Sequence, residues 1–434
     1  MNLDVIQLFT PFFFVFIALE FFWLRRQGKA YYRLNDSIAD LGTGVISQLA
    51  GVFYRVLIVA CFAWVNQNWS LQVLVAGFPA VPDGNPFGGP GWPVNLLSWV
   101  LVFLAIDFAY YWAHRHCHEV NFLWATHVVH HSSEEYNLSV ALRQSALQGL
   151  FTLFYYLPLA FIGVTWQMYV MCYGLNLIYQ FFIHTRAVGK LHPWIEAVWN
   201  TPSHHRVHHG VNPKYQDKNY AGVFILWDRL FGTYQPEEEE VVYGITVPFR
   251  SWNPLWANLH VWKSMFRDAA HTQRWADKLK VFFAAPGWKP ADLGPAIVPQ
   301  EVSVDSFRKF DVPASRSLLA YAAVQFVAAS LMGVVLLELA PKVGLWPLVG
   351  PAFYVVLTLN NLGGVLERRQ WALWSEMARL LALPAVAAVG FGLGWGVPLW
   401  AVGVAAAFAG VALAWLWAVR AELTEPAEPQ MATA

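Results

Sequence analysis

The chain is poor in charged residues. Asp, Glu, Lys and Arg make up 13% of its 434 residues, whereas hydrophobic residues make up 57%. An ordinary soluble domain is about one quarter charged, so this composition excludes the usual soluble protein and indicates an integral membrane protein. The formal net charge is zero, and no charge excess favours nucleic acid as a partner.

Cysteine is scarce as well. Cys61, Cys117 and Cys172 show no CxxC pairing. Cys61 and Cys172 lie in apolar runs and are expected to be small buried hydrophobic residues. Cys117 stands among histidines, but no spacing supports it as a ligand. The first apolar run lacks a basic stretch before it and a small-residue cleavage site after it, which predicts a span and not a cleaved signal.

Long apolar runs are abundant. Nine of them come near the roughly 20 residues that a helix needs to cross a bilayer. They predict an all-α integral membrane protein with about nine transmembrane helices and a cytoplasmic histidine-rich helical region. The runs are Leu3–Trp23, Thr43–Val65, Val94–Trp112, Leu138–Ile162, Trp166–Ile183, Ser317–Leu339, Leu345–Leu362, Trp371–Phe391 and Pro398–Val419.

Lys and Arg in the short loops predict the orientation. Arg25, Arg26, Lys29 and Arg33 follow the first run, whereas residues 78–93 contain neither residue type. Cytoplasmic loops carry the positive charges, so we expect the N-terminus outside, the C-terminus inside and every histidine cluster on the cytoplasmic side. The membrane is a bacterial inner membrane or the endoplasmic reticulum, and the alanine-rich final runs favour the former.

Three regions follow from this layout. Residues 1–184 carry five spans and the first two histidine clusters, residues 185–313 form a cytoplasmic cap with the third cluster, and residues 314–434 form a four-helix transmembrane block. Within the cap, Trp252–Phe266 has aromatic and leucine residues at helical spacing. This spacing predicts a helix that lies on the membrane surface or packs into the core.

Twelve of the 14 histidines lie between His114 and His209. Residues three or four apart share a helix face, so three short helices can direct eight imidazoles at one volume. Neutral imidazole is the commonest metal ligand, and eight are too many for one ion. We therefore predict a two-metal centre of iron, zinc, copper or nickel. The three clusters are His114 and His118; His127, His130 and His131; and His205, His208 and His209.

The remaining histidines divide by position. His184 ends the fifth run and is a ninth candidate ligand. His116 and His204 adjoin better-placed neighbours, and their role stays open. No ligand role is expected for His192, His260 and His271.

Carboxylates near the clusters are candidates for orienting the ligands. Asp107 lies two helical turns before His114, and we predict that it accepts a hydrogen bond from a ligand imidazole. Asp107 and Glu119 are the candidate catalytic carboxylates. Weaker candidates for the same supporting role are Glu134, Glu135 and Asp228.

These clusters resemble the signature of the fatty acid hydroxylase and sterol desaturase superfamily, which reads HxxxH, HxxHH and HxxHH. Longer stretches look like its glyceryl-ether-cleaving branch, the alkylglycerol monooxygenases. The likeness covers about Leu3 to Trp288, and the last four runs match in layout only. The similar stretches are Asp107–Arg115, His130–Ser139, Ala141–Ser145, Asn200–Gly210, Lys218–Val223 and Trp227–Thr233.

The resemblance implies a non-haem di-iron centre that uses O2 to hydroxylate a lipid C–H bond. In the ether branch, hydroxylation beside the ether oxygen gives a hemiacetal, which collapses to a fatty aldehyde and a glycerol, with tetrahydrobiopterin as reductant. The eight clustered histidines and His184 would be the iron ligands. Val188 stands where fatty acid hydroxylases often have another histidine, which argues against that branch.

The resemblance also implies partners: a membrane lipid substrate, O2 and an external electron donor, because the sequence shows no reductase or haem domain and no G-x-G-x-x-G after a strand. Four residues that follow the second cluster, two before the fourth run and two near its start, are candidates for contacting the lipid head group, although Arg143 could instead snorkel to the interface. They are Tyr136, Asn137, Arg143 and Gln144.

Two other functions stay open. A sterol or fatty acyl desaturase or hydroxylase would use the same centre with a different cavity. A non-catalytic metal-binding or transport protein would use the same histidines as a storage or transport site. Independently of the function, the spacing alone also allows a metal other than iron, such as zinc. The oligomeric state does not follow from the sequence.

Overall fold

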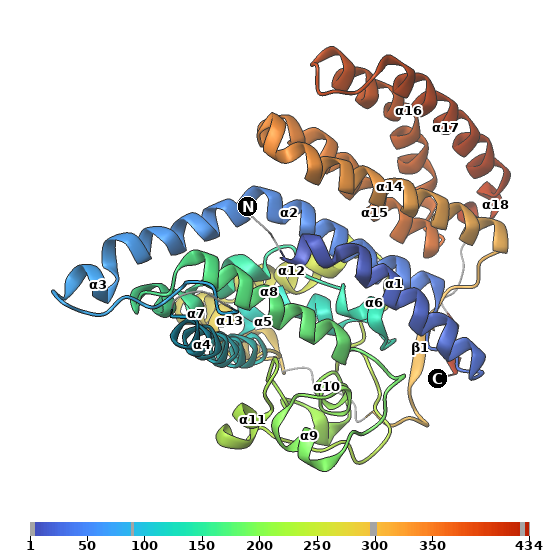
Figure 1. Cartoon of the computed structure of the whole chain (residues 1–434). Coiled ribbons are helices and arrows are strands. Elements are labelled where there is room, and N and C mark those ends of the chain that lie inside the picture. Colours follow the sequence, from blue (N-terminus) through green and yellow to red (C-terminus); the bar gives the residue numbers. More distant parts are fainter. Residues whose placement is uncertain (1–4, 88–90, 296–301, 426–429, 434) are drawn as a thin grey trace.

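The computed structural model describes residues 5–87, 91–295, 302–425 and 430–433, and its described part is mainly helical (Figure 1). This confirms the predicted all-α membrane fold. Two short strands, β1 (Arg308–Asp311) and β2 (Gln430–Thr433), pair antiparallel. Leu3, where the first predicted span begins, lies outside the described residues.

The helices follow one another along the chain without a repeated motif. They are α1 (Val5–Arg26), α2 (Leu34–Trp69), α3 (Leu71–Leu74), α4 (Trp92–Glu119), α5 (Asn121–His131), α6 (Leu138–Ala141), α7 (Gln148–Phe161), α8 (Trp166–Ile183), α9 (Pro193–Val198), α10 (Pro202–His208), η1 (Pro213–Tyr215), α11 (Leu226–Phe231), α12 (Pro254–His271), α13 (Trp275–Phe283), η2 (Ala291–Leu293), α14 (Arg316–Val343), η3 (Trp346–Leu348), α15 (Val349–Leu366), α16 (Gln370–Gly392), α17 (Leu399–Ala418) and α18 (Arg420–Thr424).

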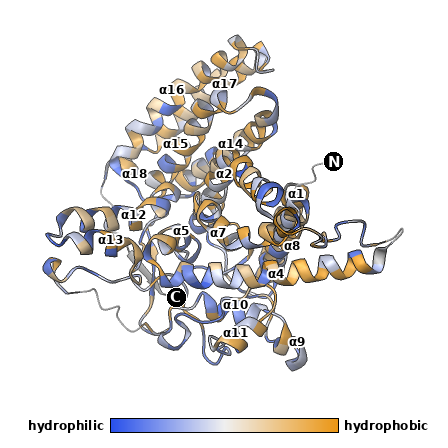
Figure 2. Ribbon diagram, turned by 90° about the vertical axis from the view of Figure 1, so that its left-hand side faces the viewer, coloured by the Kyte–Doolittle hydropathy of each residue, from blue (hydrophilic) through white to orange (hydrophobic). Residues whose placement is uncertain are grey.

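Seven helical segments in the described ranges are long and apolar enough to cross a membrane. They contain α1, α2, α4, α14, α15, α16 and α17. Many of their large apolar side chains point outward: Val56 on α2 is 72% exposed and Val411 on α17 is 68% exposed. Figure 2 shows hydrophobic residues dominating α16 and α17. Such surfaces suit lipid and not water, so the chain is an integral membrane protein.

The fourth predicted span is wrong as a single helix, and the count of nine spans is not confirmed. The run Leu138–Ile162 breaks after α6, and its helical remainder, α7, has 14 residues. At 1.5 Å per residue, α7 is about 21 Å long, short of the roughly 30 Å hydrocarbon core. The break has a physical cause: Arg143 turns into the protein and ion-pairs with the buried Asp40. A continuous lipid-facing helix would leave that cation in hydrocarbon.

The helix predicted over Trp252–Phe266 is confirmed as α12. One face packs inward through Ala257 and Met265, whereas Phe266 on the other side is 60% exposed. Helix α12 contacts α2, α5, α13 and α15. It therefore supports α5, which carries the second histidine cluster.

The last four long helices do not stand apart from the rest. Ile46 and Leu49 of α2, Ala329 of α14 and Leu359 of α15 belong to one buried apolar cluster. A second cluster joins α14, α15, α16 and α17. The division at residue 314 therefore stays a proposal about chain organisation.

Candidate metal centre

Nine histidines form two adjoining groups. His114, His118, His127, His131 and His208 make the five-histidine group, and His130, His184, His205 and His209 make the four-histidine group. Within each group, one ring nitrogen per residue lies within 4.8 Å of all the others. The rings of His131 and His209 stack at 4.4 Å between centroids, so the groups share a boundary.

Local helix geometry produces this convergence, as the spacing predicted. His114 and His118 lie on the last turns of α4, and His127, His130 and His131 lie on α5. Helix α10 carries the third cluster, with His209 at its C-cap, and His184 is the C-cap of α8. The two groups therefore draw on four helices.

The distances between the ring nitrogens match those expected between neighbouring ligands of one metal ion. His127 Nε2 lies 3.0 Å from His114 Nε2 and 3.1 Å from His131 Nε2. His184 Nε2 lies 3.0 Å from both His130 Nε2 and His205 Nε2. Metal–imidazole bonds of about 2.1 Å place neighbouring ligand nitrogens roughly 3 Å apart. The buried Nε2 atoms of His118, His208 and His209 also have no hydrogen-bond partner, which leaves their lone pairs for a cation. His204 and His260 share this state outside both groups, so the convergence of the rings, and not the unpartnered nitrogen alone, defines the site.

The opposite ring nitrogens are anchored by oxygen atoms. An imidazole that donates Nδ1–H to an oxygen keeps the lone pair of Nε2 for a metal. Five of the nine have this arrangement, with these Nδ1–oxygen distances: His114 to the Tyr220 carbonyl 2.7 Å, His127 to Gln148 Oε1 3.1 Å, His130 to the Arg143 carbonyl 3.0 Å, His184 to the Gln180 carbonyl 2.6 Å and His208 to the Lys218 carbonyl 2.9 Å.

Burial keeps the imidazoles neutral. Desolvation lowers the pKa of His127 and His184 to about 4 and that of His208 to about 3. It also lowers the pKa of His131 and His209, and neighbouring imidazoles add to the effect. Metal ligation requires the neutral ring, so these positions are ready to bind a cation at neutral pH.

The other histidines and Cys117 lie outside both groups in the described part of the chain. His116 Nδ1 contacts the Tyr155 hydroxyl at 2.8 Å. His204 caps α10 through a capping box with Thr201. His260 Nδ1 contacts the Ala257 carbonyl of its own helix at 3.0 Å. The structure thus separates the two histidines whose role was open from the nine that converge.

The predicted hydrogen bond between Asp107 and a ligand imidazole is wrong. The buried Asp107 carboxylate accepts from Asn176 Nδ2 at 2.7 Å, from the backbone N–H groups of Val223 and Phe224 at 2.8 and 3.0 Å, and from Trp227 Nε1 at 2.9 Å. Asp107 therefore anchors the segment that follows Tyr220, whose carbonyl holds His114. Asp107 thus acts on His114 indirectly, through the backbone that presents the Tyr220 carbonyl.

Asp228 has a parallel role. It accepts from the backbone N–H groups of Tyr220 and Ala221, each at 2.8 Å, and so fixes the same segment from its other side. Glu119, by contrast, pairs with the partly exposed Arg115 at 2.8 Å and lies outside both histidine groups. Its link to the centre is indirect, because Arg115 also donates to the Tyr111 hydroxyl at 3.3 Å, and Tyr111 contacts Thr233, a donor to Asp228.

Glu134 and Glu135 hold other segments. Glu134 accepts from the backbone N–H of Phe310 at 2.6 Å. Glu135 pairs with Arg33 at 3.0 Å and with Lys309 at 2.7 Å. Glu134 therefore ties the chain after the second cluster to β1, and Glu135 ties it to β1 and to the start of α2. Within the described residues, neither carboxylate hydrogen-bonds to an imidazole.

The proposed head-group residues are largely occupied inside the protein. Asn137 Nδ2 donates to the Tyr31 carbonyl at 2.6 Å, and its Oδ1 caps α6. Arg143 is 2% exposed, which contradicts both a head-group contact and snorkelling. Tyr136 is buried and stacks on His184 at 5.7 Å. Gln144, partly exposed, donates to the Ala141 carbonyl at 2.9 Å.

Sequence reasoning missed two buried carboxylates. Glu20 of α1 accepts from the Leu138 backbone N–H at 2.9 Å and from the Thr185 hydroxyl, next to His184. Asp40 of α2 pairs with Arg143 at 3.1 Å. The available signal was an ionisable residue in or beside an apolar run, which is a functional candidate by default.

Comparison with known proteins matches this region to a family. Residues 99–233, which contain all nine histidines, match the fatty acid hydroxylase family model. The chain is 37% identical over 383 residues to the alkylglycerol monooxygenase of Xenopus tropicalis, covering 87% of this chain and 81% of that protein. The human alkylglycerol monooxygenase is 36% identical over 387 residues, with the same shares covered. This chain belongs to the alkylglycerol monooxygenase family.

A more distant relative shares part of the chain. The ornithine lipid hydroxylase of Rhizobium tropici is 25% identical over 227 residues, covering 52% of this chain and 63% of that protein. No solved structure matches the chain. Family membership makes the chain a lipid-hydroxylating membrane monooxygenase, and the open alternative of a non-catalytic metal transporter is set aside.

Proposed function

We propose that this enzyme cleaves the ether bond of alkylglycerol-type lipids with two iron ions, one in each histidine group. The observation that carries the proposal is the pair of adjoining groups of five and four histidines. The names of relatives that align over most of the chain support the substrate class. All nine histidines are the proposed ligands.

The overall reaction inserts one oxygen atom of O2 beside the ether oxygen and reduces the other to water. Two electrons and two protons enter, so ROCH2R′ + O2 + 2e⁻ + 2H⁺ gives ROCH(OH)R′ + H2O. This hemiacetal collapses to an aldehyde and an alcohol. Iron bound at the histidines would supply the O2 activation that hydroxylation of an unactivated C–H bond needs.

The protein's own residues prepare the site for this chemistry. Backbone carbonyls of Tyr220, Arg143 and Lys218 fix the orientation of three imidazoles. Asp107 and Asp228 hold the segment that presents the first of these carbonyls. Burial excludes water, which strengthens every electrostatic interaction in the site and limits side reactions.

The electrons come from outside the chain in this proposal, with tetrahydrobiopterin as the diffusible reductant. The positive loops support a centre on the cytoplasmic side, with the N-terminus outside and the C-terminus inside. The short α7–α8 hairpin leaves this orientation unchanged. A hairpin that enters the membrane and returns to the same side does not change the side on which the following segments lie.

The test is an assay of the purified, iron-loaded protein in lipid vesicles with O2 and tetrahydrobiopterin. Release of one fatty aldehyde per alkylglycerol and per O2 consumed would support ether cleavage. Hydroxylation of a fatty acyl chain, a sterol or an ornithine lipid, with alkylglycerol untouched, would replace this substrate class with the sister one. Two bound ions without O2 consumption on any of these lipids would contradict the proposal.

A further inference from the structure

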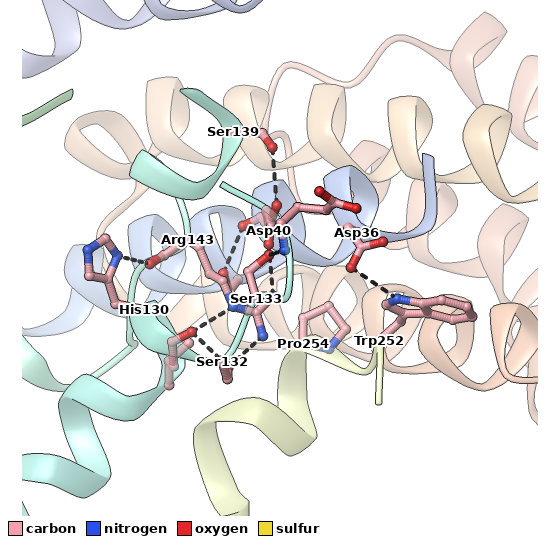
Figure 3. A network of polar contacts seen from close by, with 12 residues as sticks. Asp36, Asp40, His130, Ser132, Ser133, Ser139, Arg143, Trp252 and Pro254 are labelled. Atoms are coloured by element: carbon pink, nitrogen blue, oxygen red, sulfur yellow. Dashed lines mark hydrogen bonds and ion pairs between the residues drawn. The ribbon is translucent and has the colours of Figure 1, made fainter. Parts of the chain in front are cut away.

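The Arg143 side chain ties the second histidine cluster to α2. Its Nη1 lies 3.1 Å from Asp40 Oδ1, its Nε donates to the Val129 carbonyl at 2.6 Å, and its Nη2 donates to Ser132 Oγ at 2.8 Å. Asp40 is fully buried, and Arg143 is 2% exposed. Figure 3 shows this network between α2 and the end of α5.

The same residue holds a candidate ligand through its backbone. The carbonyl oxygen of Arg143 lies 3.0 Å from His130 Nδ1 (Figure 3). His130 belongs to the four-histidine group, and its ring nitrogens contact Arg143 and His184. Any shift of the Arg143 backbone would therefore rotate or release the His130 ring.

Helix α2 packs closely against the backbone next to Arg143. A Cβ on Gly44 would lie 2.5 Å from the Leu142 carbonyl oxygen, so only glycine lets α2 approach the segment so closely. Asp40 and Gly44 are four residues apart and share one helix face. Asp40 also accepts from Ser139 Oγ at 3.1 Å, which fixes the start of the same segment.

We propose that Asp40 and Gly44 of α2, acting through Arg143, position His130 and set the metal affinity of the four-histidine group. The inference rests on the proposed metal ligation. Asp40, Gly44 and Arg143 are positioning residues, since none contributes a ligand atom to either group. The five-histidine group has its own supports, from Tyr220, Gln148 and Lys218.

The experiment measures Fe2+ binding to three variants, Asp40→Asn, Gly44→Ala and Arg143→Lys. Metal-free full-length protein is titrated anaerobically with Fe2+, and bound iron per chain is counted. Loss of an outer partner of a ligand costs roughly 10–100-fold in metal affinity. We expect one of the two ions to bind about 10–100-fold more weakly in each variant, while the other binds as in the wild type.

Two matched controls separate positioning from general destabilisation. Arg379→Lys alters a second buried ion pair, Arg379 with Glu376 at 2.6 Å, on a helix without metal ligands. Gly410→Ala changes a glycine of α17 whose Cβ would meet open space. Both controls should bind two ions with wild-type affinity. Thermal unfolding and gel filtration show which variants fold. If Gly44→Ala does not fold, Asp40→Asn, which keeps the size of the side chain, still tests the inference.

The outcomes are distinct. Selective weakening of one ion in the folded variants supports the inference. Unchanged affinity for both ions, or equal weakening of both, overturns it and leaves the proposed function standing. Wild-type protein that binds no iron contradicts the proposed function itself.

Discussion

Two buried polar networks in this protein differ in whether all their buried polar atoms have hydrogen-bond partners. At the histidine groups, the described residues include buried ring nitrogens without any partner, on His118, His205, His208 and His209. Around Arg379 in the C-terminal helices, no charged atom is left in that state. Buried polar atoms are costly when unpaired, so the first network fits nitrogens that would ligate a cation, whereas the second network is architectural.

In the C-terminal network, the charged groups find their hydrogen-bond partners within the network itself. Arg379 donates to both oxygens of Glu376 at 2.6 and 2.7 Å, to Gln325 at 2.7 Å and to the Tyr354 hydroxyl at 2.8 Å. The Tyr321 hydroxyl also donates to Glu376 Oε1, at 2.8 Å. These residues come from α14, α15 and α16, so the pair holds three helices together. A charge inside a membrane bundle is thus not by itself a mark of chemistry.

The largest expected effect comes from removing a proposed ligand. His208→Ala should reduce ether-lipid hydroxylation to below about 1% of wild type, since loss of even an outer partner costs roughly 10–100-fold. Iron per chain should fall with it. The matched control is His260→Ala, because His260 hydrogen-bonds within α12 and lies outside both groups. Full activity in His208→Ala would refute the assigned centre.

Breaking the C-terminal pair should affect stability and spare the metals. Arg379→Leu leaves the fully buried Glu376 carboxylate without its cation, and such losses cost about 3–5 kcal/mol. Thermal unfolding should show the loss, while iron content of the remaining folded protein stays at two per chain. Loss of iron from folded Arg379→Leu protein would break the distinction between the networks.

An intermediate effect is expected at Asp107. Asp107→Asn can no longer accept from all four donors, so the segment after Tyr220 loosens and His114 loses its fixed acceptor. Affinity for the ion at the five-histidine group should fall by roughly 10–100-fold, measured by Fe2+ titration. Glu119→Gln is the matched control, since its exposed pair with Arg115 contributes at most about 0.5 kcal/mol. Equal effects of both substitutions would contradict the role of Asp107.

A smaller, graded effect follows from pH. Burial lowers the pKa of His127 and His184 to about 4, whereas the unfolded chain titrates near 6.5. Below about pH 6.5 the unfolded state takes up protons that the folded metal-free protein does not, so stability falls as pH falls. The loss is about 1.4 kcal/mol per pH unit for each such histidine, down to the folded pKa.

Thermal unfolding of chelated protein from pH 8 to 5 measures this slope. The Tm should be level at pH 7–8 and fall below about pH 6.5. Arg379→Leu should start from a lower Tm and show the same slope, because its network contains no histidine. A Tm that stays constant down to pH 5 would argue against the neutral buried imidazoles.

Helical spacing was enough to predict which histidines share a helix face, but not the residues that support them. His114 with His118, and His127 with His130 and His131, converge because residues three or four apart share a face whatever the tertiary fold. Asp107 was singled out as a carboxylate within an apolar run, yet three of its four donors lie between residues 223 and 227. Those contacts span more than a hundred residues, and no periodicity in the sequence encodes them.

Apolar run length predicted the membrane character and seven of the spans in the described residues. It failed at Leu138–Ile162, where hydropathy cannot show that Arg143 turns inward to a carboxylate on α2. The sequence by itself determined which histidines could gather into a metal site and the lipid setting, because both depend on local spacing and composition. Only the tertiary structure decided how nine imidazoles divide into groups of five and four, and which carbonyls orient them. Those depend on where helices far apart in the chain meet.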